Sequence, residues 1–168
     1  MDAVELRAMQ APYKERYKTD PAAAVITLKA RGSIDNDNIA CKVETGRALA
    51  MAGLHPATGG SGLELCSGDM LLEALVACAG VTLKSVATAI EVPLASGHVI
   101  AEGDLDFRGT LGVDKEAPVG FAEIRLRFEV ETSAPQDKLD LLLKLTERYC
   151  VVYQTLARPP ALVVALSS

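Results

Sequence analysis

The sequence predicts a single α+β domain whose strands pair mostly in an antiparallel way. Two segments, at about 68–90 and 135–149, have the length and apolar content of helices. Segments in which apolar and polar residues alternate, as in half-buried strands, lie on either side of them. The order is therefore strands, helix, strands, helix and strand, which is typical of an α+β fold. A chain of 168 residues can bury one hydrophobic core without disulfide or metal staples.

The first sixty residues contain the opening strands. Residues 2–19 are rich in Lys, Arg and Glu and predict a short amphipathic helix or an extended arm that ends at Asp20-Pro21. Alternating residues then predict the first strand, a turn rich in Asp and Asn follows, and two more strands precede a loop rich in Gly and Pro. These segments are 24–31, 33–38, 39–44, 48–54 and 55–62.

The rest of the chain holds both long helices. Ser67 or Asp69 is the expected cap of the first helix, which is apolar at almost every position and so is expected to be buried on most of its circumference. Two alternating strands follow, and Pro135 opens the second helix, with an inner face of Leu139, Leu142, Leu143 and Leu145. The two strands are residues 98–109 and 122–132. After residue 149 the second helix continues or kinks, and the last predicted element is a strand at 161–167.

The composition limits the kinds of partner and the cellular compartment that we expect for this protein. The net charge of −5 argues against nucleic acid or an anionic membrane as the main partner. The first twenty residues carry several acids and no apolar core, so they do not resemble a signal peptide, and apolar runs are broken by Glu, Lys or Gly. We therefore expect a cytosolic protein that spans no membrane.

The four cysteines raise the question of chemistry. In a reducing cytosol they do not predict a disulfide framework, and their spacing, with only His55 and His98 as imidazoles, matches no zinc pattern. Cys66 and Cys78 lie twelve residues apart, about 18 Å along one helix, whereas a disulfide needs Cα atoms within about 7 Å. Cys78 therefore needs a partner from elsewhere or has none, and Cys150 is the candidate. A buried cysteine is more often a small hydrophobic residue than a reactive thiol.

Two blocks of sequence resemble the OsmC/Ohr family. The first is CSGDMLLEALVACAGVTL, which is similar to a family helix of the form E-L-L-x-A-A-x-x-x-C, with Asp69 nine positions before Cys78. The second is ERYCVVYQTL, which is similar to a family pattern C-P-V-S-x-x-L and begins its match at Cys150. The resemblance covers about residues 22–168, leaving residues 1–21 as an N-terminal arm or short helix.

The resemblance implies a fold and an activity. The fold would be antiparallel sheets wrapped around a buried central helix, in an intertwined homodimer. The activity would be thiol-dependent reduction of organic, including lipid, hydroperoxides to alcohols, with Cys78 as the peroxidatic and Cys150 as the resolving thiol. It implies no bound cofactor or metal, and an external dithiol or lipoyl-type reductant. The alternative is a dimer of the same fold that binds an apolar small molecule or senses redox state without peroxidase turnover.

The sequence does not identify which residue supplies the cation that the family places beside Cys78. Apolar surroundings raise a thiol pKa, so a nearby positive charge is expected if Cys78 is to react at neutral pH. The family implies an arginine held by the acidic residue of the helix, for which the candidates are Arg31 and Arg47, with His55 as a further donor. Asp69 either orients that arginine or only stabilises the start of the helix.

Overall fold

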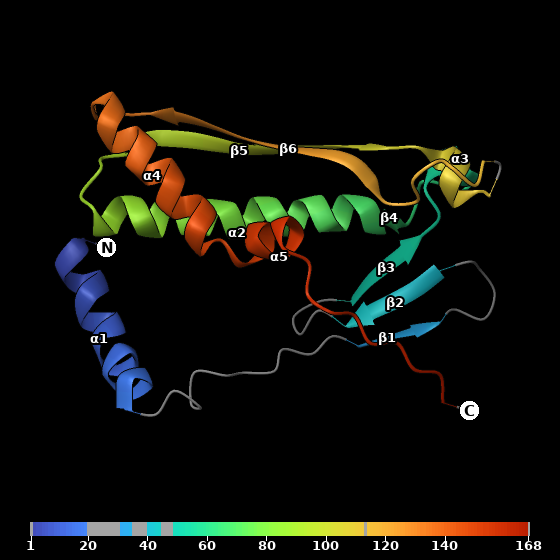
Figure 1. Ribbon diagram of the computed structural model, residues 1–168, viewed down its shortest axis with the longest axis horizontal. Coiled ribbons are helices and arrows are strands. Elements are labelled where there is room, and N and C mark those ends of the chain that lie inside the picture. The colour runs from blue at the N-terminus through green and yellow to red at the C-terminus, as the bar shows by residue number, and fades with distance from the viewer. Residues whose placement is uncertain (1, 20–30, 35–39, 45–48, 113, 168) are drawn as a thin grey trace. The chain divides into compact units, whose positions relative to one another are not determined.

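The computed structural model describes residues 2–19, 31–34, 40–44, 49–112 and 114–167 (Figure 1). They fall into two compact units, each described here by itself. Unit 1 comprises Met1–Arg7, Ala74–Ile100 and Arg127–Ser168. Unit 2 comprises Ala8–Glu73 and Ala101–Leu126.

Unit 2 contains a four-stranded sheet in the order β1-β2-β3-β4. The antiparallel strands β1 (Arg31–Ile34), β2 (Ala40–Glu44) and β3 (Leu49–Gly53) are followed by the 3-10 turn η2 (Pro56–Thr58) and by β4 (Leu65–Cys66), which runs parallel to β3. The predicted strands 39–44 and 48–54 are confirmed. The predicted strand 24–31 lies outside the described residues except for Arg31, and the predicted turn begins too early, because Ser33 and Ile34 still pair with β2. Strand β4 was not predicted, because its two residues are too few to show an alternating pattern.

The predicted first helix is α2, Ser67–Ala89. It ends in a Schellman-like turn, in which Glu91 adopts φ 59° and the N–H of Val92 donates to the carbonyl of Ala87 at 2.8 Å. The prediction that α2 is buried on most of its circumference is wrong for the single chain. Its buried side chains are Leu75, Ala79, Leu83, Val86 and Ala87.

The exposed part of α2 is apolar as well. Val81 is 73% exposed, and only 22% of the most apolar 18-residue window is buried. By length and composition α2 could cross a membrane, since the mean hydropathy of that window is 1.7. The sequence analysis did not anticipate this, because it treated the apolar runs as broken by Glu, Lys or Gly. The core helix of a soluble protein meets the same criterion.

A long hairpin follows α2 (Figure 1). Strands β5 (Ser96–Leu105) and β6 (Phe121–Glu131) form a two-stranded sheet and confirm the predicted pair. The first strand does not reach residue 109, because Asp106 caps the short helix α3 (Phe107–Thr110) by accepting from the N–H of Arg108 at 3.0 Å.

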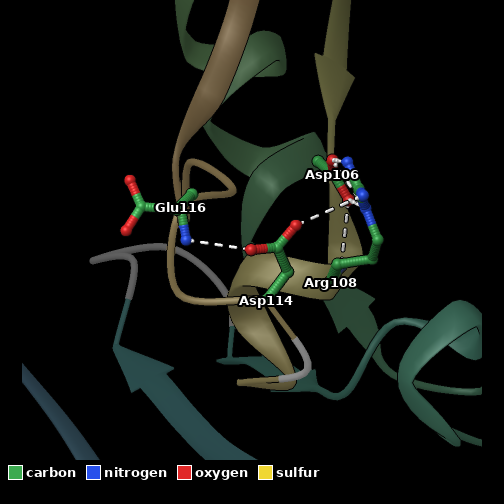
Figure 2. Close-up of polar contacts among 4 residues, drawn as sticks. All are labelled: Asp106, Arg108, Asp114 and Glu116. Carbon is green, nitrogen blue, oxygen red and sulfur yellow. Dashed lines mark hydrogen bonds and ion pairs between the residues drawn. The ribbon is translucent and has the colours of Figure 1, made fainter.

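Charged side chains fix the connection between these strands (Figure 2). The guanidinium of Arg108 bonds the carboxylates of Asp106 and Asp114, the latter at 3.3 Å. Asp114 in turn accepts from the N–H of Glu116 at 3.0 Å. The carboxylates therefore serve as turn residues of the hairpin.

Unit 1 contains the main apolar cluster. The predicted second helix is α4 (Gln136–Tyr149), followed by α5 (Val151–Ala157). Leu142 is 2% exposed, whereas Leu143, one residue further around the helix, is 45% exposed, so its assignment to the inner face is wrong. Leu142 packs with residues at the end of α2 and just after it, namely Leu83, Val86, Ala87 and Val92.

The two ends of the chain differ from each other. Residues 2–19 are helical over α1 (Ala3–Thr19), one of the two predicted alternatives, and Arg7 reaches Glu91 at 3.8 Å. The predicted strand at 161–167 is wrong for the single chain, because these residues have no regular structure and are exposed. Leu162 and Leu166, for example, are 86% and 99% exposed.

Candidate functional site

Cys150 lies at a bend between two helices in unit 1, visible in Figure 1 between α4 and α5. Its backbone is extended, with φ −74° and ψ 108°. Its backbone is hydrogen-bonded to both helices: its N–H donates to the carbonyl of Thr146 in α4, and its carbonyl accepts from the N–H of Gln154 in α5, each at 2.9 Å. Because Cys150 is both the last cap of α4 and the first cap of α5, its fully buried side chain is held in one place.

Cys78 lies in the middle of α2, also within unit 1, and its side chain is half-buried. Burial raises the pKa of the Cys78 thiol, but hydrogen bonds to its sulfur together lower that pKa below the ordinary 9.0. The donors are the N–H of Val152, the Cys150 thiol, the N–H of Val151 and the Thr82 hydroxyl. The structure therefore brings the two predicted cysteines into hydrogen-bond contact and favours the thiolate at Cys78.

The pKa of Cys150 moves in the opposite direction. Burial raises the pKa of this thiol, and its hydrogen bond to Cys78 and the negative charge there raise it further. The N–H groups of Tyr153 and Val152 lower the pKa of Cys150 by less than these causes raise it. Cys78 therefore ionises at a lower pH than Cys150, and the Cys150 thiol is the hydrogen-bond donor of the pair.

The donors around Cys78 were not anticipated from the sequence. The first N–H groups of a helix have no partner within it, and the bend at Cys150 directs those of Val151 and Val152 toward the thiolate. Thr82 is one turn after Cys78, and its hydroxyl also reaches the Cys78 carbonyl oxygen at 2.8 Å, so its single proton can serve only one acceptor at a time. A usable signal was the valine at 151 where the family pattern has proline, because proline has no N–H to donate.

The expected cation does not appear among the groups that act on Cys78 in the part of the chain that the structure describes. Arg31 starts β1 opposite Glu44, and only its backbone is described, whereas Arg47 lies outside the described residues. Their proposed roles stay predictions. Among the described residues, neutral donors lower the pKa of Cys78.

Asp69 and Cys66 belong to a different place, a cavity of about 350 Å³ in unit 2. His55 lines it too; its Nδ1 accepts from the N–H of Ala57 at 3.0 Å, and its ring stacks on Phe107 with centroids 4.9 Å apart. Within the described residues Asp69 makes no ion pair and the Cys66 sulfur makes no hydrogen bond. Asp69 is in the first turn of α2, where a carboxylate stabilises the helix.

Comparison with known proteins decides the family. A family model described as OsmC-like protein matches residues 60–165, which include both cysteine blocks. The chain belongs to the OsmC-like family. The resemblance seen in the two cysteine blocks is thereby confirmed. No curated protein matches this OsmC-like chain in sequence.

Solved structures show that the OsmC-like chain also has the family's mixed α/β fold. An OsmC-like protein from Mycoplasma pneumoniae has a TM-score of 0.65 at 16% identity, covering 80% of this chain and 89% of its own. An organic hydroperoxide resistance protein OsmC from Legionella pneumophila has a TM-score of 0.61 at 16% identity, with 80% and 91% covered. One from Elizabethkingia anophelis gives 0.61 at 16% identity, with 80% and 90% covered. At such identities the likeness shows the fold alone.

Proposed function

We propose that this OsmC-like chain reduces organic hydroperoxides to alcohols, with Cys78 as the peroxidatic and Cys150 as the resolving thiol. The observation that carries the proposal is the hydrogen-bonded pair in which the pKa of Cys78 is lowered and that of Cys150 is raised. A peroxidatic thiol must be the thiolate, and a resolving thiol must wait beside it in protonated form. Two family members of the same fold are named for organic hydroperoxide resistance, which supports this assignment.

In the first step the Cys78 thiolate attacks one oxygen of the hydroperoxide. The sulfur–oxygen bond forms as the O–O bond breaks, so Cys78 is oxidised to sulfenic acid and the substrate leaves as an alkoxide, which takes up a proton to become the alcohol. The Cys150 thiol and the Thr82 hydroxyl, both donors to the sulfur, are the nearest sources of that proton.

The second step uses the pairing of the two thiols. Once Cys78 is a neutral sulfenic acid, the negative charge that helped to raise the pKa of Cys150 is gone, so Cys150 loses its proton more readily. Its sulfur then attacks the Cys78 sulfur, a disulfide forms and water leaves. An external dithiol, of the lipoyl type or another, returns the pair to two thiols by exchange.

The remaining parts of the proposal concern assembly and setting. We propose a cytosolic homodimer without bound cofactor or metal, intertwined around α2 as a central helix. The largely unburied α2 and the exposed apolar residues near the C-terminus support it, because a second copy would cover apolar surface that one chain leaves in solvent. In such a dimer Arg31 or Arg47, oriented by Asp69, would add positive charge near Cys78.

Peroxide consumption tests the proposal. Wild type, Cys78→Ser, Cys150→Ser and Cys66→Ser are compared on cumene hydroperoxide, a lipid hydroperoxide and hydrogen peroxide, with dithiothreitol or a lipoyl protein as reductant. We expect no turnover with Cys78→Ser, at most a single oxidation without disulfide formation with Cys150→Ser, and wild-type turnover with Cys66→Ser. Unchanged turnover in Cys78→Ser would refute the assignment.

The positive charge has its own test. Arg31→Gln, Arg47→Gln and Asp69→Asn are compared for kcat/KM with cumene hydroperoxide. A loss of kcat/KM shared by Asp69→Asn and one arginine variant would support the proposal that Asp69 orients that arginine. Full activity in all three would show that the neutral donors act alone.

A second candidate is a family member that binds an apolar small molecule or senses oxidation without turnover. It is favoured by one observation: no cation acts on Cys78 within the described residues, so the thiolate can form without the charge that would assist peroxide cleavage. The same assay separates the two, since a sensor would form the Cys78–Cys150 disulfide with peroxide but show no sustained turnover with any reductant.

A further inference from the structure

A second cavity lies beside the bend between α4 and α5, within unit 1. Its volume is about 510 Å³, which is in the range of small-molecule sites. It is formed by the last turn of α4, one side of α5 and the residues that follow α5. The side chains that matter for its chemistry are Arg148, Tyr149, Val151, Gln154, Thr155 and Arg158.

Two guanidinium groups without carboxylate partners line this cavity. Neither Arg148 nor Arg158 forms an ion pair within the described residues, although the chain carries a net charge of −5. Arg148 instead lies over the ring of Tyr149, 5.6 Å from its centroid. No acidic side chain lines the cavity. Two such forks of N–H donors are suited to an anion, above all a carboxylate or phosphate.

The other polar side chains of the cavity have fewer free donors than the arginines, because Gln154 and Thr155 each donate to a backbone carbonyl. The Gln154 amide donates to the carbonyl of Glu147 at 2.7 Å, and the Thr155 hydroxyl donates to that of Val151 at 2.8 Å. The arginines are therefore the cavity's main source of free donors.

Apolar surface completes the cavity. The side chains of Tyr149 and Val151 are 58% and 69% exposed, and both lie in its wall. A ligand that combines an anionic head with an aliphatic or aromatic body would satisfy the guanidiniums and cover this surface at once. An uncharged apolar molecule would leave the guanidinium donors unmatched, and a cation would be repelled by them.

We infer that this cavity binds an amphipathic carboxylate, with its acid group on Arg148 and Arg158 and its apolar body on Tyr149 and Val151. The site is separate from the proposed peroxide chemistry and assigns no step to it. It does lie next to that chemistry, because Val151 presents its side chain to the cavity and its N–H to the Cys78 sulfur.

Titration of the full-length reduced chain with octanoate tests the inference without any peroxide. Binding is measured by calorimetry and by the backbone amide signals of Val151 and Gln154. The ligand series adds octanol, octylammonium and octyl phosphate. The variants are Arg148→Gln and Arg158→Gln, with Arg127→Gln as the matched control, since Arg127 pairs with Glu129 at 3.1 Å and lies outside the cavity.

We expect one octanoate per chain, shifts of the two amide signals, and little binding of octanol or octylammonium. Each cavity variant should weaken octanoate binding about tenfold, the usual effect of losing a hydrogen bond to a charged group, and Arg127→Gln should not. Equal affinity in all three variants, octanol binding as tightly as octanoate, or no binding at all would overturn the site. Tighter binding of octyl phosphate than of octanoate would overturn the carboxylate assignment in favour of a phosphate.

Discussion

Cys78 in unit 1 and Cys66 in unit 2 are both half-buried thiols, yet their surroundings differ. Four donors reach the sulfur of Cys78, and its pKa is lowered even though burial acts against this. The sulfur of Cys66 lies at the end of β4 and accepts no hydrogen bond within the described part of the chain. Exposure therefore does not distinguish the two thiols, whereas the supply of donors does.

The supply of donors comes from the way the chain bends. The extended backbone of Cys150 separates α4 from α5 and leaves the first N–H groups of α5 without partners inside the helix. Two of them serve Cys78. The cavity around Cys66 contains a carboxylate, Asp69, and an imidazole, His55, whose Nδ1 is already an acceptor. We therefore predict that changes near the bend alter the chemistry of Cys78, and that changes in the unit 2 cavity that leave Asp69 in place do not.

The largest effect is expected from removing the thiols themselves. At pH 7 iodoacetamide should label Cys78 faster than Cys66, so Cys78→Ser should abolish the fast phase of labelling and Cys66→Ser should leave it intact. In wild type the rate of the fast phase should fall as pH falls through the pKa of Cys78, with its midpoint below 9.0. Mass spectrometry of the labelled peptides identifies the site. A fast phase that survives in Cys78→Ser would contradict the comparison.

The next effect comes from Cys150 as a donor. Cys150→Ala removes a hydrogen bond to the thiolate, so the pKa of Cys78 should rise and its labelling at pH 7 should slow roughly tenfold. Cys150→Ser is the matched control, because its hydroxyl can still donate while no disulfide can form. Identical labelling profiles for the two variants would mean that Cys150 does not act as a donor.

A single backbone donor can be removed at Val151. Proline is tolerated at the first position of a helix, and the extended ψ of 108° at Cys150 suits a residue that precedes proline. Val151→Pro should therefore keep the bend and lose one N–H, which raises the pKa of Cys78 and slows labelling at pH 7 about fivefold. Val151→Ala keeps the N–H and should label like wild type. Equal slowing in both variants would assign the effect to the side chain instead.

The sequence predicted the helices and most strands because their patterns are local. Strands β2 and β3 and helices α2 and α4 all begin and end within one or two residues of the predicted bounds. The end of β5 was missed because Asp106 caps a helix through a side-chain bond that alternation does not show. The family pattern predicted that Cys150 pairs with Cys78. The direction in which the N–H of Val151 points depends on how the backbone bends at Cys150, and no sequence periodicity predicts such a bend.

The smallest effect on Cys78 is expected from a change that destabilises unit 2. Gly103 lines the cavity of Asp69 and Cys66, and a Cβ there would lie 2.5 Å from the ring of Phe121. The ring must shift, so Gly103→Ala should lower the free energy of unfolding by about 1–3 kcal/mol in urea titrations. Gly120→Ala, where a Cβ meets nothing within 4 Å, should leave it nearly unchanged. Neither variant should move the pH midpoint of Cys78 labelling, since all the donors to this sulfur lie in unit 1. A shifted midpoint in Gly103→Ala alone would show that the two thiol environments are coupled.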